Sequence, residues 1–249
     1  MAPSDQTERY AHAVQSSLKR LKKPMLNIST GNMYEWITHT WNPVKGICFH
    51  DCSYCFMKKL LGDRMKAIRI EDAEFKTDLG SGNFIFVGSS VDAWAMNVPD
   101  EWILRMLDYC DGFDNRYLFQ SKNPARFLDF TEHPVFKKSV FCTTVETNRW
   151  YPEVMNNSPR PQERVIAMAR MTELGFTTYE TAEPLMDFDL EPMVDLLLTC
   201  APSQINIGKN TNWKVQIPEP DAAKVKELID ALRGQSAIVV KSNAKKWNT

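Results

Sequence analysis

The amino-acid sequence predicts an α/β protein with a curved, mainly parallel sheet, helices on its outer face and a polar concave lumen. Three observations support this fold class. Short strand patterns alternate with longer helical patterns, and parallel neighbours in a sheet need such crossover helices. The strand patterns carry apolar side chains at alternate positions, whereas strands covered on both faces are apolar throughout. A cysteine-rich loop follows the first strand of the parallel series.

The N-terminal 35 residues are expected to form a helix and a linker. Residues 6–22 place Tyr10, Val14 and Leu18 at helical spacing, and Pro24 ends the pattern. The basic end of this helix is typical of a solvated terminus. Because no composition shift follows, residues 36–249 are predicted to form one core domain.

The core domain alternates strands and helices. Strands are expected at 36–41, 84–88, 117–122, 139–147, 177–183, 204–208 and 237–240. Helices are expected at 54–65, 99–110, 124–130, 162–174, 190–201 and 221–232. The second strand, Phe-Ile-Phe-Val-Gly, is short and apolar, as buried strands are. The helical patterns carry apolar residues at i, i+3 and i+4, and Gly175 and Gly234 follow two of them as expected at helix C-termini.

Strand parity separates a helix-facing side from a lumen side. The apolar set comprises Tyr117, Phe119, Phe141, Val145, Ile205 and Ile207. The opposite set comprises Gln120, Lys122, Cys142, Thr144, Glu146, Gln204 and Asn206. Because successive side chains point to opposite faces of a sheet, the second set is predicted to line the lumen.

Composition excludes several classes of protein. Hydrophobic residues make up 43% and charged residues 24% of the 249 residues, which is typical of a globular chain. The net charge of −1 gives no overall attraction to nucleic acid or anionic lipid. No apolar run matches a membrane span or the apolar part of a signal peptide, so we expect a cytoplasmic protein without a membrane partner.

Three of the six cysteines, Cys48, Cys52 and Cys55, form a C-x3-C-x2-C pattern just after the first strand. Three thiolates on one tight loop bind three irons of a 4Fe–4S cluster and leave the fourth iron open to an exogenous ligand. A zinc site that adds His50 is less favoured, because zinc modules usually carry two separated ligand pairs. The other three cysteines are isolated, so one cluster is expected.

This pattern, with Tyr54 before its last cysteine, resembles the radical S-adenosylmethionine (SAM) superfamily. Further segments are similar to a phage-associated group of that superfamily, the Gp37/Gp68-like proteins, which are distantly similar to spore photoproduct lyase. They are Thr-Trp-Asn-Pro at 40–43, Gly-Ser-Ser-Val-Asp at 88–92, Phe-Gln-Ser-Lys-Asn-Pro at 119–124 and Glu-Pro-Leu at 183–185. The resemblance extends over most of the core domain.

The resemblance implies a partial (β/α)6 barrel, an open TIM-like barrel, that holds one 4Fe–4S cluster on Cys48, Cys52 and Cys55 and binds SAM. In such enzymes SAM binds the open iron, and its reductive cleavage gives a 5′-deoxyadenosyl radical that abstracts hydrogen from a substrate. A reductant such as flavodoxin or ferredoxin is implied, and a phage-encoded chain would act in the host cytoplasm. A nucleic acid or nucleoside substrate is suggested by distant kinship alone.

The resemblance also assigns residues that contact SAM. Tyr54 is expected against the adenine. Gly88, Ser89 and Ser90 stand where the superfamily often has Gly-Gly-Glu, which holds the SAM amino group, and Asp92 follows them. Serine hydroxyls accept hydrogen bonds from an ammonium group, so this departure is compatible with the same role.

Five further residues complete the expected SAM site. Thr144 and Glu146 end the fourth strand, where polar side chains commonly meet the ribose hydroxyls. Lys122 or Arg149 is expected to pair with the SAM carboxylate, since charge-assisted hydrogen bonds are the strong ones. Gln120 faces the same lumen by strand parity.

The catalytic residue is not identified. Cys142 faces the lumen and is a candidate hydrogen donor, as a cysteine is in spore photoproduct lyase, but no motif aligns it and we expect a buried filler. The alternative function is a non-catalytic iron–sulfur protein, either an electron carrier or a sensor. The predicted polar lumen discriminates between the enzyme and the electron carrier, because an electron carrier needs no polar lumen.

Overall fold

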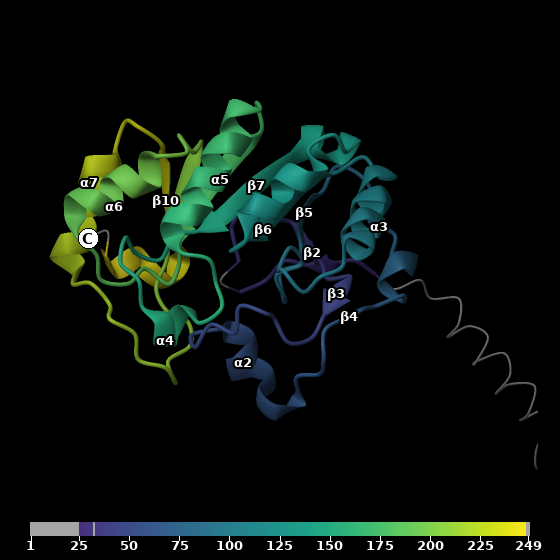
Figure 1. The fold of residues 1–249 in the computed structure, drawn as a ribbon, viewed down its shortest axis with the longest axis horizontal. Coiled ribbons are helices and arrows are strands. Elements are labelled where there is room, and N and C mark those ends of the chain that lie inside the picture. Colours follow the sequence, from purple (N-terminus) through teal and green to yellow (C-terminus); the bar gives the residue numbers. More distant parts are fainter. Residues whose placement is uncertain (1–24, 32, 248–249) are drawn as a thin grey trace, which may run out of the picture.

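A curved eight-stranded sheet forms the centre of the structure, a computed structural model that describes residues 25–31 and 33–247 (Figure 1). Its strands, in spatial order, are β1 (Asn27–Ile28), β2 (His39–Trp41), β5 (Phe84–Val87), β6 (Arg116–Ser121), β7 (Ser139–Thr144), β8 (Thr177–Ala182), β9 (Gln204–Ile207) and β10 (Ala237–Val240). The strands from β2 to β10 pair in parallel, and β1 joins β2 antiparallel. Since the order begins at β1 and ends at β10, the sheet is open, and the predicted partial barrel is confirmed.

Helices cover the convex face of this sheet (Figure 1). They are α3 (Asp100–Asp111), α5 (Pro161–Glu173), α6 (Leu190–Leu198) and α7 (Ala222–Leu232), with the 3-10 helices η3 (Pro124–Phe130) and η4 (Pro134–Lys138). The predicted parity is confirmed: Tyr117, Phe119 and Phe141 pack in a core beside α3 and α5, and Val145 and Ile205 pack in a second core beside α6 and α7.

The sequence predicted a polar lumen, but part of the depth of the lumen is apolar. Its floor is an apolar cluster that includes Phe86, Leu118 and Cys142, and residues 33–37 fill it from within. Tyr34 stacks on Trp36 with ring centroids 4.9 Å apart. The cavity open to a ligand lies at the carboxyl ends of the strands, where Gln120, Lys122 and Thr144 line it.

Some element boundaries differ from the prediction. The strand expected at 139–147 ends at Thr144, so Glu146 lies in the following loop. The first strand is only β2, and the helix expected at 54–65 is α2 (Phe56–Leu61) followed by the 3-10 helix η1 (Gly62–Arg64). The segment at 124–130 is a 3-10 helix rather than an α-helix.

Several short elements went unpredicted, because two to six residues carry little periodic signal. They are β3 (Val44–Lys45), β4 (Arg69–Ile70), α4 (Pro152–Met155), η2 (Glu74–Lys76) and η5 (Ser242–Trp247). The helix expected at 6–22 lies outside the described residues, and the domain boundary near residue 35 stays a prediction. Within the described part of the chain, no helix combines the length and the apolar character needed to cross a membrane.

Candidate functional site

A cavity of about 1060 Å3 opens at the carboxyl ends of the parallel strands. In open α/β sheets this is the edge at which ligands usually bind. The cysteine loop, residues 88–92 after β5 and residues 120–122 at the end of β6 line one side of the cavity. Residues 30, 31, 33 and 34, the segments 183–184 and 209–211, and Lys241 line it as well.

All three motif cysteines line this cavity. Cys48 and Cys55 are partly exposed, Cys52 is buried, and none is in a disulfide. Burial, with the Asp92 charge beside it, raises the pKa of Cys48 to about 12 in the absence of a cation. Within residues 25–31 and 33–247 no three His, Cys, Asp or Glu side chains are already placed to hold one metal ion. A cubane cluster does not require such convergence, because each thiolate binds a different iron; three soft thiolates around one cavity therefore fit it.

The segment after β7 braces the cysteine loop. Asn156 Nδ2 donates to the Asp51 carbonyl oxygen at 2.6 Å, and Asn157 Nδ2 donates to that of Phe49 at 3.0 Å. The hydroxyl of Ser158 lies 3.3 Å from the Cys52 Sγ. These two asparagines therefore tie the segment to the cysteine loop.

A glycine allows the other end of the cysteine loop to approach the chain before β4. Gly46 has a φ of 124°, and a Cβ there would lie 2.5 Å from the Ala67 carbonyl oxygen. The adjacent Ile47 N–H donates to the Lys66 carbonyl oxygen at 2.9 Å. Only glycine permits this contact, which fixes the chain immediately before Cys48.

Asp92 connects three segments of the cavity wall. Its carboxylate accepts hydrogen bonds from the Ser121 hydroxyl and from the backbone N–H groups of Lys122 and Trp94, and its Oδ2 lies 2.8 Å from the His50 Nε2. Burial alone would raise the pKa of Asp92, but His50 and the backbone donors outweigh it, so the pKa lies below its ordinary value. These hydrogen bonds occupy the Asp92 carboxylate, which positions the cysteine loop through His50.

The residues before Asp92 form a turn against Asn42. Gly88 has a φ of 80°, which glycine adopts without strain. The Asn42 Oδ1 accepts from the Ser90 N–H at 2.9 Å and from the Ser89 hydroxyl at 3.2 Å. Both serines line the cavity beside the cysteine loop, where the SAM amino group was expected.

A buried polar cluster lies behind Tyr54. The Tyr54 hydroxyl donates to the Glu146 carboxylate, whose Oε2 lies 2.7 Å from the Arg164 Nη1. The Lys122 Nζ lies 3.5 Å from the other carboxylate oxygen and 5.2 Å from the centre of the Tyr54 ring. Burial by itself would raise the pKa of Glu146, but the Arg164 and Lys122 charges outweigh it and the net shift is downward.

Only two members of this cluster reach the cavity surface. Tyr54 and Lys122 line the cavity, whereas Glu146 and Arg164 are completely buried and do not. Burial would lower the pKa of Lys122, yet the Glu146 charge raises it overall, so the ammonium stays protonated. Sequence reasoning missed Arg164. Its spacing to Met168 and Met171, four and seven residues later on the buried stripe of α5, is the signal that it points inward.

The remaining predicted residues lie at different depths. Gln120 and Thr144 line the cavity and meet at 3.4 Å, and Gln120 also accepts from the Tyr34 hydroxyl. Arg149 does not line the cavity; it pairs with Asp187 and Asp189 instead. Cys142 is buried in the apolar floor, consistent with the filler role expected of it.

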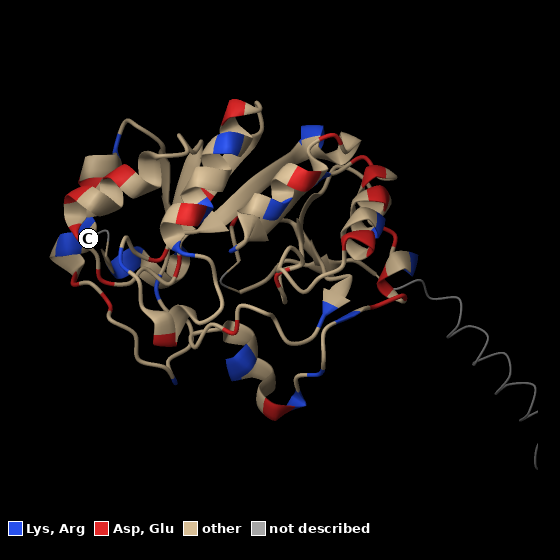
Figure 2. Ribbon diagram, in the orientation of Figure 1, with Lys and Arg blue, Asp and Glu red and all other residues tan. Residues whose placement is uncertain are grey.

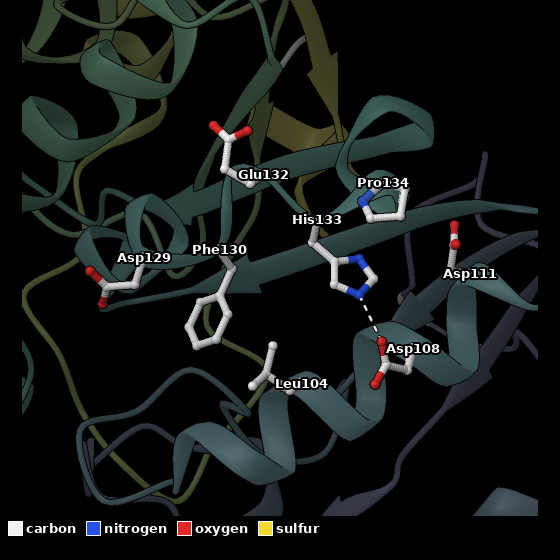
Figure 3. Close-up of a pocket in the computed structure, with 8 residues that line it drawn as sticks. All are labelled: Leu104, Asp108, Asp111, Asp129, Phe130, Glu132, His133 and Pro134. Atoms are coloured by element: carbon white, nitrogen blue, oxygen red, sulfur yellow. Dashed lines mark hydrogen bonds and ion pairs between the residues drawn. The ribbon is translucent and has the colours of Figure 1, made fainter.

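A second hollow lies on the outer face between α3 and the segment that follows η3 (Figure 3). It measures about 450 Å3, and four carboxylates surround it. His133 pairs with Asp108 at 3.1 Å, and Asp111 pairs with Lys138 at 3.4 Å. Because no sequence motif falls in this hollow, whereas all three motif cysteines line the cavity at the strand ends, that cavity is the candidate functional site.

Comparison with solved structures shows the fold. Spore photoproduct lyase with bound AdoMet and dinucleoside spore photoproduct is similar at a TM-score of 0.61 and 11% identity, covering 85% of this chain and 78% of that one. Streptococcus suis SuiB bound to S-adenosylmethionine is similar at a TM-score of 0.51 and 12% identity, covering 96% and 54%. No protein-family model and no curated protein matches the sequence.

Proposed function

We propose that this chain is a radical SAM enzyme that holds one 4Fe–4S cluster on Cys48, Cys52 and Cys55. The observation that carries the proposal is the large cavity that these three cysteines line together. Pockets for small molecules usually measure about 300–1000 Å3, so there is room for SAM and part of a substrate. An electron carrier needs no such space, and the cavity therefore favours an enzyme over that alternative.

The likeness in fold to two proteins with bound SAM supports the same proposal. Membership of the phage-associated group rests on the sequence segments alone and stays a prediction. A reductant such as flavodoxin or ferredoxin belongs to the proposal, because cleavage of SAM by this route consumes an electron. When bound, the cluster would supply that electron to SAM, whose C–S bond would break to give methionine and a 5′-deoxyadenosyl radical able to abstract a hydrogen atom from a substrate.

The residues of this chain bind and orient SAM. We assign the Lys122 ammonium to the SAM carboxylate and the ring of Tyr54 to the adenine. Ser89 and Ser90 accept from the SAM amino group, and the hydroxyl of Thr144 meets the ribose. Gln120 holds Thr144 in place from the neighbouring strand.

We assign Glu146 and Arg149 to positioning other groups rather than to direct contact with SAM. The Glu146 oxygens already serve Tyr54, Arg164 and Lys122. We therefore assign to Glu146 the positioning of Tyr54 and Lys122, rather than the direct ribose contact expected from the sequence. Arg149 fixes the loop at 187–189 through two carboxylates.

Loss of any motif cysteine is expected to abolish cluster assembly. After anaerobic reconstitution the wild-type chain should contain about four irons. Cys48→Ser, Cys52→Ser and Cys55→Ser should each lose the broad absorbance of the cluster, because a thiolate ligand is missing. Iron, sulfide and absorbance per chain are the measurements.

The matched controls are Cys110→Ser and Cys200→Ala, which alter cysteines far from the loop in sequence and should retain full iron content. Stoichiometric zinc with no iron uptake would refute the cluster and favour the zinc alternative. Equal iron loss in the controls would show that the motif has no special role.

Lys122→Met is expected to weaken SAM binding by roughly ten- to a hundredfold, the effect of losing one charge-assisted hydrogen bond. The fold should persist, because Glu146 keeps its pairing with Arg164. Equilibrium dialysis of SAM against iron-loaded protein measures the effect, and Lys122→Arg should retain most of the affinity. Unchanged binding by Lys122→Met would contradict the assignment.

A further inference from the structure

The near-zero net charge conceals two regions of opposite sign. Residues 56–69, which include α2, carry five basic residues and one acidic residue. Residues 100–114, which include α3, carry five acidic residues and one basic residue. In the ribbon of Figure 2, basic residues (blue) lie on and after α2 and acidic residues (red) lie along α3. The basic region lies at the cavity, since α2 follows Cys55 directly and Lys58 and Lys59 line the opening.

Several cations near the opening have no acidic partner among residues 25–31 and 33–247. Lys59 donates to the Thr211 carbonyl oxygen, Lys214 lies over the Trp213 ring at 5.7 Å, and Lys209 lies over the Trp247 ring. By contrast, Lys58 pairs with Asp51. Positive charge at the mouth of the cavity is thus left available to an anionic ligand.

Trp213 is an exposed aromatic side chain beside these lysines. It is 74% exposed, whereas the other six tryptophans are buried or partly buried. The Lys59 Nζ lies 5.6 Å from its ring centre, so the indole is next to α2. The exposed indole offers a flat face on which a planar group such as a base can stack.

The loop that carries Trp213 is ordered by its own asparagines. Asn210 Nδ2 donates to the carbonyl oxygens of Asn212 and Val215, and Asn212 Oδ1 accepts from the Lys214 N–H. Asn212 Nδ2 also donates to the Cys55 carbonyl oxygen at 3.3 Å, which connects the loop to the cysteine motif. An exposed ring held in this way loses little conformational entropy when it binds.

We propose that Lys59, Lys209, Trp213 and Lys214, here called the cavity rim, bind a single-stranded nucleic acid and present one of its bases to the cavity. Lysines attract the phosphates without regard to sequence, and an exposed indole stacks on a base. Because the lumen floor is closed by the cluster around Tyr34, only the mouth admits a nucleotide. The inference names the substrate class of the proposed enzyme and rests on that proposed function for its catalytic meaning.

The test is the binding of a fluorescein-labelled twelve-nucleotide thymidine strand to the full chain, followed by anisotropy. We expect binding that weakens with salt, with a slope of about −0.7 in log–log form for each phosphate neutralised. Trp213→Ala should weaken binding by roughly five- to a hundredfold through lost stacking. Lys59→Ala should make the salt slope less steep, while Lys137→Ala, an exposed lysine on the acidic side, should leave it unchanged.

Competitors separate the possible ligands. Polyglutamate of equal charge should not displace the strand, and thymidine monophosphate should displace it only at much higher concentration. The proposal is overturned if polyglutamate competes equally, if the mononucleotide binds as tightly as the strand, or if properly folded Trp213→Ala, checked by melting, binds like wild type. Because binding needs neither iron nor SAM, failure here leaves the iron measurements intact, and failure of iron loading leaves strand binding intact.

Discussion

Arg164→Met is expected to lower the free energy of unfolding by about 3–5 kcal/mol, the usual cost of breaking a buried ion pair by removing one partner. Arg164 and Glu146 are both completely buried and lie 2.7 Å apart. Without the guanidinium, the Glu146 carboxylate keeps Lys122 at 3.5 Å and the Tyr54 hydroxyl. The Thr144 and Pro159 carbonyl oxygens also lose their donor. Urea denaturation at neutral pH measures the change.

The double variant Glu146→Gln with Arg164→Met is the matched control. Removing the carboxylate charge as well should recover part of the lost stability, so the two substitutions should not be additive. Additive losses would contradict the interaction. A loss of less than about 1 kcal/mol for Arg164→Met alone would show that the pair is not the buried ion pair described.

Glu180→Gln is expected to stabilise the protein above neutral pH. Glu180 is completely buried on β8, and its Oε1 accepts from the Cys200 thiol at 3.0 Å, while its Oε2 has no hydrogen-bond partner among the residues that the structure describes. Burial raises the pKa of Glu180 from 4.5 to about 8. Because the folded state binds the proton more tightly than the unfolded state, the stability from this group is fully present below about pH 4.5. It is lost as pH rises toward about 8.

Each unit of pKa difference between the folded and unfolded states corresponds to about 1.4 kcal/mol. Wild type should therefore lose roughly 3–5 kcal/mol of stability from Glu180 as the pH rises from about 4.5 to about 8. Glutamine has the same shape and no charge, and Glu180→Gln should flatten the curve and exceed wild type at pH 8. Thermal or urea unfolding at pH 5, 6.5 and 8 measures it. The exposed variant Glu173→Gln should follow wild type, and parallel curves for Glu180→Gln and wild type would contradict the buried charge.

Strand positions were predictable from sequence because each strand has a local signal. Alternation in 117–122 and 204–208 located β6 and β9 within one residue, and the parity of Phe119 and Ile205 gave the face that packs on helices. The parallel pairing of the strands followed from the helices between them. The C-x3-C-x2-C spacing located the cavity wall, since a loop after the first parallel strand must lie at the carboxyl edge of the sheet.

The parts that escaped prediction depend on contacts between distant segments. The bracing of the cysteine loop by Asn156 and Asn157 joins positions about a hundred residues apart, with no local pattern to mark it. Glu146 had the expected parity, but its burial with Arg164 depends on how α5 packs on β7. Tyr34 was assigned to a linker, yet its hydroxyl bonds Gln120 and Thr181 inside the barrel.

The proposal that SAM binds an open iron of the cluster is tested most directly by electron paramagnetic resonance. The spectrum of the reduced, iron-loaded protein is recorded with and without SAM. A radical SAM enzyme leaves one iron without a protein ligand, and SAM occupies that position when it enters the cavity. Saturating SAM is expected to change the spectrum of wild type, and 5′-deoxyadenosine is expected to be released under dithionite. An iron-loaded, reduced protein whose spectrum SAM leaves unchanged, with no 5′-deoxyadenosine formed, would contradict the proposal and favour a non-catalytic electron carrier.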